Sequence, residues 1–88
     1  MTKPRGYKAW TPTERKIYLT LGGVIRYART NAGLSQADLA ARVGLSRTSI
    51  ANIENGHQKP LIDTLVWIGH HLSLKTSEIL RACEDCWR

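Results

Sequence analysis

The sequence contains no long apolar run, no low-complexity tract and no internal repeat. A membrane-spanning helix needs roughly 18 or more consecutive apolar residues, so we expect no membrane association. The N-terminus also lacks the continuous apolar segment of a secretory signal, which favours a cytoplasmic protein. The 88 residues are enough for one small domain with a single hydrophobic core.

Residue clusters that carry catalytic chemistry are also missing. We find no Ser/His/Asp arrangement, phosphate-binding glycine loop or pair of catalytic carboxylates, so we predict no enzyme activity and no cofactor. Histidine occurs three times and cysteine twice, which is too few for a convincing metal site. Cys83 and Cys86 form a C-x-x-C pair. We interpret them as two reduced thiols without a role, with a metal site or a redox switch as alternatives.

Acidic residues are scarce and unevenly placed. The chain has 13 Lys/Arg against 7 Asp/Glu, a net charge of +6. Residues 1–60 carry a net charge of +7, whereas residues 61–88 carry −1. Such asymmetry predicts a polyanionic partner that binds one side of the molecule.

The chain divides into an arm and a folded part. Residues 1–10 show no periodicity and carry Lys3, Arg5 and Lys8, so we predict a basic N-terminal arm there. This arm either enters a minor groove of nucleic acid or remains a solvated tail. Residues 11–88 are expected to form the domain.

Hydrophobic spacing predicts an all-α fold, and no strand pattern competes with it. The first helix is expected at about 12–31, either unbroken or split near Gly22. Four shorter helices are expected at about 36–43, 47–55, 61–72 and 76–84. The fourth and fifth helices are expected to bury Leu61, Leu65, Ile68, Leu72, Ile79, Leu80 and Cys83.

Local signals mark the ends of these helices. Thr11 with Glu14, and Ser35 with Asp38, have the spacing of capping boxes. Ser46 is a third candidate cap, and glycines stand where the first three helices end, at Gly33, Gly44 and Gly56.

The helix expected at 47–55 has an unusual polar face. Its only large apolar side chains are Ile50 and Ile53, and Glu54 lies beside them. The opposite arc, roughly 140° wide on a helical wheel, carries short side chains and one arginine. Arginine matches the acceptor pair of guanine, asparagine matches adenine, and a threonine or alanine methyl suits thymine. The polar arc consists of Arg47, Thr48, Ala51, Asn52 and Asn55. Its chemistry predicts a helix that enters the major groove of double-stranded DNA.

The preceding helix supports this interpretation. Its N-terminus, with Ser35 as cap and Gln36 next, would present free N–H groups and a partial positive charge to a phosphate. Only about three residues separate the two helices, and Ala40 is small where the helices must cross.

At this point a family resemblance can be stated. The segment QADLAARVGLSRTSIANIENG, residues 36–56, resembles the helix-turn-helix of the Xre/Cro class, the lambda-repressor-like DNA-binding domains. Gln36 opens the motif, Ala40 is its fifth residue and Gly44 its ninth, with Ile50 and Ile53 at the fifteenth and eighteenth positions. The resemblance extends over about 21–80 and implies a compact five-helix bundle whose third helix reads DNA.

The resemblance also implies roles for individual residues. Positions that reach base edges in the family correspond to Arg47, Thr48 and Asn52, with Ser49 and Ala51 as further candidates. Positions that contact phosphates correspond to Gln36, Ser46 and Asn55, and Lys59 is a plausible addition from the following loop. Arg29 matches an arginine that forms a structural ion pair with the glutamate here numbered Glu54.

Two features depart from the family pattern. Leu61 stands where a Ser or Thr usually caps the fourth helix, and Trp67 occupies a position that is usually polar. Trp67 either forms a dimer or partner surface or packs under Trp10 and the N-terminal extension.

The function implied is that of a sequence-specific, nucleoid-associated transcriptional regulator. We expect a homodimeric repressor of a palindromic operator; the alternatives are an antitoxin and a controller of a restriction–modification operon. The expected partners are double-stranded DNA, a second copy and a toxin or antirepressor protein. We expect the dimer to form through the fifth helix and the C-terminal tail, with Ile79, Cys83 and Trp87 as contacts.

Overall fold

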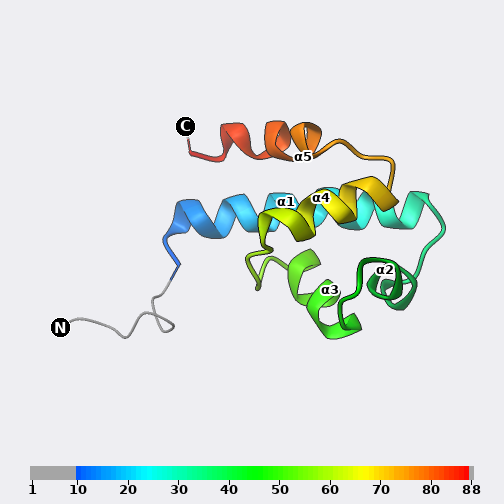
Figure 1. Cartoon of the computed structure of the whole chain (residues 1–88). Helices are drawn as coiled ribbons and strands as arrows, with labels where there is room; N and C mark the ends of the chain where they lie inside the picture. Colours follow the sequence, from blue (N-terminus) through cyan, green and yellow to red (C-terminus); the bar gives the residue numbers. More distant parts are fainter. Residues whose placement is uncertain (1–9, 88) are drawn as a thin grey trace.

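The computed structural model describes residues 10–87, apart from the side chain of Trp87. The predicted arm, with Lys3, Arg5 and Lys8, lies outside the described residues except for Trp10. Helices alone make up the regular structure of the described range, so the all-α prediction is confirmed (Figure 1). They are α1 (Pro12–Asn31), α2 (Gln36–Val43), α3 (Arg47–Glu54), α4 (Ile62–His71), α5 (Thr76–Cys83) and the 3-10 helix η2 (Glu84–Trp87).

The predicted caps determine where the first three helices begin. The Thr11 and Ser35 side chains accept hydrogen bonds from the backbone N–H groups of Glu14 and Asp38, and both capping boxes are complete. Ser46 Oγ accepts from the Ser49 N–H at 3.0 Å and caps α3. In contrast, α4 begins after Leu61, which offers no side-chain cap. The first turn of α4 therefore lacks this local source of stability.

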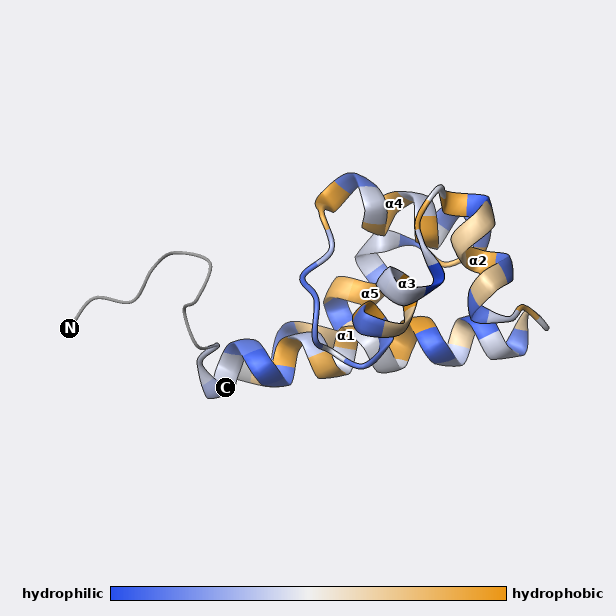
Figure 2. Ribbon diagram, turned by 90° about the horizontal axis from the view of Figure 1, so that it is seen from below, coloured by the Kyte–Doolittle hydropathy of each residue, from blue (hydrophilic) through white to orange (hydrophobic). Residues whose placement is uncertain are grey.

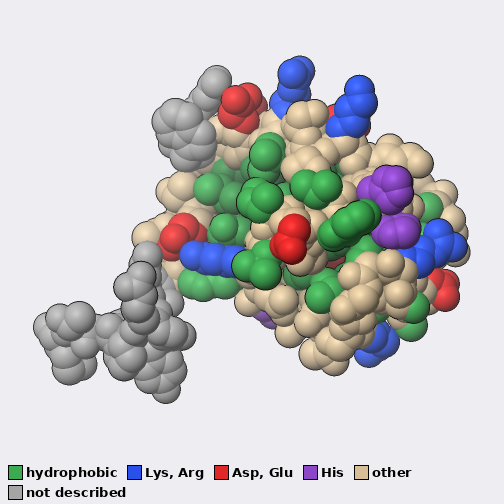
Figure 3. All heavy atoms as spheres, viewed as in Figure 1, with side chains coloured by type: hydrophobic (Ala, Val, Ile, Leu, Met, Phe, Trp, Pro, Cys, Tyr) green, Lys and Arg blue, Asp and Glu red, His purple; other side chains and the backbone are tan. Residues whose placement is uncertain are grey.

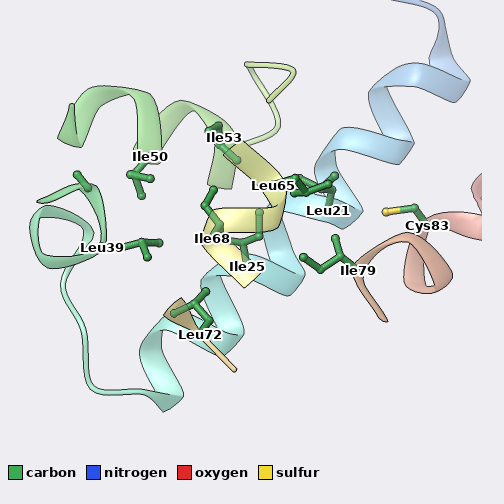
Figure 4. Packing of buried hydrophobic residues seen from close by; sticks show 11 residues of the cluster. Leu21, Ile25, Leu39, Ile50, Ile53, Leu65, Ile68, Leu72, Ile79 and Cys83 are labelled. Carbon is green, nitrogen blue, oxygen red and sulfur yellow. The ribbon is translucent and has the colours of Figure 1, made fainter. Parts of the chain in front are cut away.

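The long helix α1 packs between two groups of shorter helices. It contacts α5 and η2 on one side and α3 on another, while α2 contacts both α3 and α4. The side chains of Leu39 and Ile50 point toward Ile25 and Ile68, and Ile79 enters from α5 (Figure 4). These residues belong to one buried cluster, which comprises Leu21, Ile25, Leu39, Ala40, Ile50, Ile53, Leu65, Ile68, Leu72, Ile79 and Cys83.

The structure corrects two of the predicted core positions. Leu61 is exposed because it precedes the first turn of α4, and Leu80 is exposed because Ile79 and Cys83 define the buried face of α5. Helical spacing identified the apolar side of each helix but assigned one exposed neighbouring residue to the buried side of each.

The predicted dimer contacts on α5 are also wrong. Ile79 is fully buried and Cys83 nearly so, because both pack against the monomer's own core. They cannot bind a partner without opening the domain. The side chain of Trp87, the third predicted contact, lies outside the described residues.

Of the two interpretations of Trp67, packing under Trp10 is wrong. Trp10 instead packs on Tyr18, with ring centroids 5.4 Å apart. Trp67 is more than half exposed and contacts His70 edge to face, at 6.1 Å between centroids.

Helix α1 runs without a break through its two adjacent glycines, which resolves the alternative of two shorter helices. A Cβ atom at Gly22 would collide with the backbone carbonyl groups of Ile53 and Glu54, whereas a Cβ at Gly23 would meet open space. Gly22 therefore permits close packing of α1 against the end of α3. Sequence reasoning had counted it only as a weak point of the helix.

We expect opposite effects from alanine at these two neighbouring glycines. Gly22→Ala should lower the free energy of unfolding by about 1–3 kcal/mol, because the added methyl group overpacks the contact with α3. Gly23→Ala should raise it by about 0.5–1 kcal/mol, because alanine favours the helix and meets no neighbour. Urea unfolding of both variants measures the difference. Equal stabilisation by the two substitutions would refute the close approach at Gly22.

Candidate nucleic-acid interface

A short turn joins α2 to α3 and determines how α3 is presented. Gly44 adopts the left-handed conformation at φ 74°, which is strained for residues with a side chain. The N–H of Leu45 then donates to the Ala40 carbonyl at 3.0 Å, and Ser46 caps the next helix. The turn thus occupies residues 44–46, as the sequence predicted.

The outer face of α3 carries the predicted polar residues. Ile50 and Ile53 are each 1% exposed, and Glu54 is buried with them. Seen from below, α3 lies in front and is coloured mostly hydrophilic to neutral (Figure 2). The residues of the polar arc lie on the side away from the core: Arg47, Thr48 and Asn55 are exposed, and Ala51 and Asn52 are half-buried. Ser49, the further candidate beside the arc, is also half-buried.

The four candidate phosphate contacts all have partners within the chain. Gln36 Nε2 donates to Glu54 Oε1 at 3.0 Å, and Asn55 Oδ1 accepts from Arg26 Nη2 at 2.7 Å. Ser46 uses its oxygen as an acceptor in the cap, so its O–H remains available as a donor. The Asn55 amide likewise keeps its N–H groups for a phosphate.

The side chain of Lys59 contacts residues at the start of α1. Its Nζ is 3.2 Å from Glu14 Oε2 and lies over the rings of Trp10 and Tyr18, at 5.3 and 5.5 Å from their centroids. Arg15 Nη1 donates to the Gly56 carbonyl in the same loop at 2.5 Å. The first turns of α1 therefore hold the loop that follows α3.

Sequence reasoning missed these loop contacts. The two hydrogen bonds join residues that are separated by 41 and 45 positions in the chain, so no local sequence pattern predicts them. The one available signal was the aromatic and charged content of the N-terminal extension.

The carboxylate of Glu54 is the centre of a buried polar network. Arg29 donates to it twice, from Nε to Oε2 at 2.6 Å and from Nη2 to Oε1 at 3.0 Å. Arg26 Nε adds a longer contact of 3.4 Å, and Gln36 adds the hydrogen bond described above. Arg29 also donates to the Leu34 carbonyl at 2.7 Å. The structure thus brings together the ion pair that the resemblance implied and adds Arg26 and Gln36 to it.

The network shifts the ionisation of both main partners. Burial alone raises the pKa of Glu54, but hydrogen bonds from Arg29 and Gln36 outweigh it, so the pKa is lowered overall. The hydrogen bond to Glu54 raises the pKa of Arg29. Both side chains therefore remain charged at neutral pH, and each compensates the other's burial.

A double-mutant cycle should reveal strong coupling in this pair. Glu54→Ala should lower the free energy of unfolding by roughly 3–5 kcal/mol, or less where water reaches Arg29, because it leaves a buried charge unpaired. Arg29→Ala should cost a similar amount, and the double variant should cost less than the sum of the two. Thermal melts of the four proteins measure this coupling. Simple additivity would contradict it.

Acid should weaken the fold partly through Glu54. Its folded pKa lies below the ordinary value of 4.5, so its contribution to stability is complete above that value and is lost as pH falls through the folded pKa. Unfolding of wild type and Glu54→Gln from pH 6 to pH 2 should show a shallower acid loss in the variant. Glu84→Gln, at an exposed position, serves as the control. A variant curve parallel to that of wild type would exclude this source of acid sensitivity.

The cysteines occupy a different part of the molecule. Cys83 Sγ lies 3.6 Å from the Ile17 carbonyl, and Cys86 Sγ lies 3.3 Å from Thr20 Oγ1. Burial and the neighbouring Cys86 raise the pKa of the Cys83 thiol, which disfavours the reactive thiolate. Within residues 10–87, no three His, Cys, Asp or Glu side chains form a group that could hold a metal ion. In the same range, no helix is long and apolar enough to span a membrane.

Comparison with known proteins identifies the family. A helix-turn-helix family model matches residues 25–79, more than half of the chain. The chain belongs to this helix-turn-helix family. The match begins inside α1, so the extension that holds the loop at Lys59 precedes it. A search of curated proteins finds no match to this helix-turn-helix chain.

Solved structures with the same fold include several regulators. The restriction-modification controller protein C.AhdI from Aeromonas hydrophila superposes with a TM-score of 0.68 and 27% identity, over 70% of this chain and 94% of that one. SinR, a master regulator for biofilm formation solved in complex with DNA, superposes with a TM-score of 0.65 and 26% identity. The match covers 68% of this chain and 97% of SinR. The clp gene regulator ClgR from Corynebacterium glutamicum superposes with a TM-score of 0.73 over 77% of this chain and 72% of that one. At 20% identity, this likeness supports the fold alone.

Proposed function

We propose that this helix-turn-helix protein is a sequence-specific transcriptional regulator that acts as a homodimeric repressor on a palindromic operator. The outer face of α3 carries this proposal. It combines short polar side chains, one exposed arginine and a buried opposite side, and it is the part of the molecule that fits a major groove. The SinR structure in complex with DNA supports a DNA partner.

Base reading is assigned to the start and middle of α3. Arg47 would donate two hydrogen bonds to a guanine, and Asn52 would pair with an adenine. Thr48, Ser49 and Ala51 fill the space between them, where a methyl group suits thymine. The Glu54 network fixes the far end of α3 to α1, so these side chains approach DNA on a rigid support.

Phosphate contacts are assigned to the edges of the interface. The N-terminus of α2 presents backbone N–H groups next to Gln36, and Ser46 and Asn55 have donors to spare. Lys59 would have to exchange Glu14 for a phosphate. These groups position the helix without selecting sequence.

Control of a restriction–modification operon is the second candidate. The likeness to C.AhdI favours this second function, because the match covers nearly the whole length of C.AhdI. Transcription from a promoter carrying the selected site would separate the two roles. A repressor should only lower this transcription, so activation at any protein concentration would contradict the repressor role.

We expect alanine substitutions at Arg47 and Asn52 to reduce the base preference at different base pairs. Arg47→Ala should weaken binding to the best site by roughly 1–3 kcal/mol and relax preference at one G·C pair. Asn52→Ala should do the same at a different pair, most simply an A·T pair. Binding of each variant to a set of single-base operator changes measures this, after selection of the site from random DNA.

Three further variants make the experiment specific. Asn55→Ala should weaken all sequences equally, and Lys59→Ala should flatten the dependence of log affinity on log salt by about one unit if Lys59 meets a phosphate. Arg81→Ala removes an equal charge from exposed α5 and controls for general attraction. If Arg47→Ala weakened every operator variant equally, the assignment of base reading to Arg47 would fall.

A further inference from the structure

The loop between α3 and α4 lies on the same edge of the molecule as the polar arc. The N–H of His57 donates to the Asn52 carbonyl at 2.8 Å, so the loop continues directly from the end of α3. Gly56 packs closely on α1, because a Cβ atom there would lie 3.0 Å from the backbone of Leu19. In Figures 1 and 2 the loop lies beside α3, next to the first half of α1. A DNA backbone that follows α3 would therefore pass this loop.

Two aromatic rings support the cation of this loop. Trp10 and Tyr18, here named the aromatic platform, lie with ring centroids 5.4 Å apart. Lys59 Nζ is 5.3 Å from the Trp10 centroid, and the Arg15 guanidinium is 5.8 Å from the same centroid. A cation is attracted to the face of an aromatic ring, which restricts its position. The Lys59 side chain remains 40% exposed, so the platform orients its ammonium group without removing it from solvent.

The two carboxylate oxygens of Glu14 have different partners. Oε1 accepts from the Thr11 N–H at 2.9 Å and completes the cap of α1, whereas Oε2 lies 3.2 Å from Lys59 Nζ. Figure 3 shows a basic side chain beside an acidic one near the start of α1, on the face turned to the viewer. An ion pair that solvent reaches is weak, and a phosphate oxygen accepts from an ammonium group as a carboxylate oxygen does. A phosphate can therefore displace Glu14 from Lys59.

We propose that, in the free protein, Glu14 occupies the place that a DNA phosphate takes at Lys59 in the complex. The aromatic platform and Arg15, which binds the loop, position Lys59 for this contact. Glu14 is thus an internal competitor that lowers the affinity for DNA and leaves base preference unchanged, since phosphate contacts carry no sequence information. This proposal rests on the proposed function for DNA as the ligand. It assigns a DNA-backbone site to residues 10–18, which precede the family match at 25–79.

Replacement of Glu14 by its neutral amide tests the competition. Glu14→Gln should strengthen binding to every operator variant about two- to fivefold, the size of a surface ion pair. Glu78→Gln is the matched control, because Glu78 completes the capping box of α5 and accepts from the Lys75 N–H at 2.9 Å. Glutamine preserves both capping boxes and removes the same charge. The control should bind as wild type does, and an equal gain in both variants would overturn the proposal. Fluorescence anisotropy with a labelled operator at fixed salt measures the affinities.

A double-mutant cycle identifies the group for which Glu14 competes. In the Lys59→Ala background, Glu14→Gln should give no more gain than Glu78→Gln gives there, because the competition has lost its object. A gain as large as in the wild-type background would show that Glu14 only repels DNA as a general negative charge. That result would overturn the competition at Lys59.

Removal of one ring at a time tests the aromatic platform. Tyr18→Leu and Trp10→Leu should each weaken all operator variants alike and flatten the dependence of log affinity on log salt, and neither effect should add to that of Lys59→Ala. Trp10 precedes the cap of α1, so its replacement tests the platform even if Tyr18→Leu unfolds in a thermal melt. Tyr18→Phe keeps a ring and should restore the wild-type salt dependence. Weaker binding with an unchanged salt dependence would reduce the platform to a structural role and overturn its part in positioning Lys59.

The outcomes separate this proposal from the proposed function. If Glu14→Gln binds as Glu78→Gln does while Arg47→Ala still relaxes base preference, only the competition at Lys59 is refuted. If wild type selects no DNA sequence but Glu14→Gln strengthens binding through Lys59, the proposed function is refuted and the backbone site stands. If the chain binds no DNA, both are refuted.

Discussion

The buried carboxylate of Glu54 is the constraint on which the presentation of α3 depends. It belongs to α3, yet its hydrogen bonds come from α1 through Arg26 and Arg29 and from α2 through Gln36. One charged group therefore fixes the positions of three helices relative to one another. An apolar residue of similar size would fill the space but would leave the angle of α3 less well defined, because dispersion contacts lack direction.

Helix α1 extends this control along its length. Arg29 and Arg26 bind the end of α3, Gly22 allows the closest backbone approach, and Arg15 and Glu14 hold the loop beyond. Arg15, Gly22, Arg26 and Arg29 are separated by seven, four and three residues and so lie on one face of α1. The part of α1 before the family match thus supports the same surface as the part within it.

Features encoded by neighbouring residues were predictable from the sequence. The caps at Thr11, Ser35 and Ser46, the turn at Gly44 and the polar arc of α3 all arise within a few residues of each other. Features that depend on packing between residues far apart in the chain were not predictable from the sequence. Gly22 is required by a carbonyl of α3, the exposure of Leu80 depends on where α1 lies, and the α5 dimer contacts failed because Ile79 and Cys83 complete the monomer core. Periodicity reveals that a helix has an apolar side, but it does not reveal which neighbour covers that side.

The placement of the tryptophans has an optical consequence. Trp10 lies within 5.4 Å of Tyr18 and under two cationic groups, next to the loop that follows α3. Trp67, on α4, is more than half exposed to solvent and contacts His70. The two indoles therefore lie in different dielectric surroundings, so the wavelengths of their fluorescence emission maxima should differ. With Trp87 replaced and one of the two retained at a time, fluorescence would report separately on the loop beside the DNA-facing helix and on the outer face of α4, without an added dye.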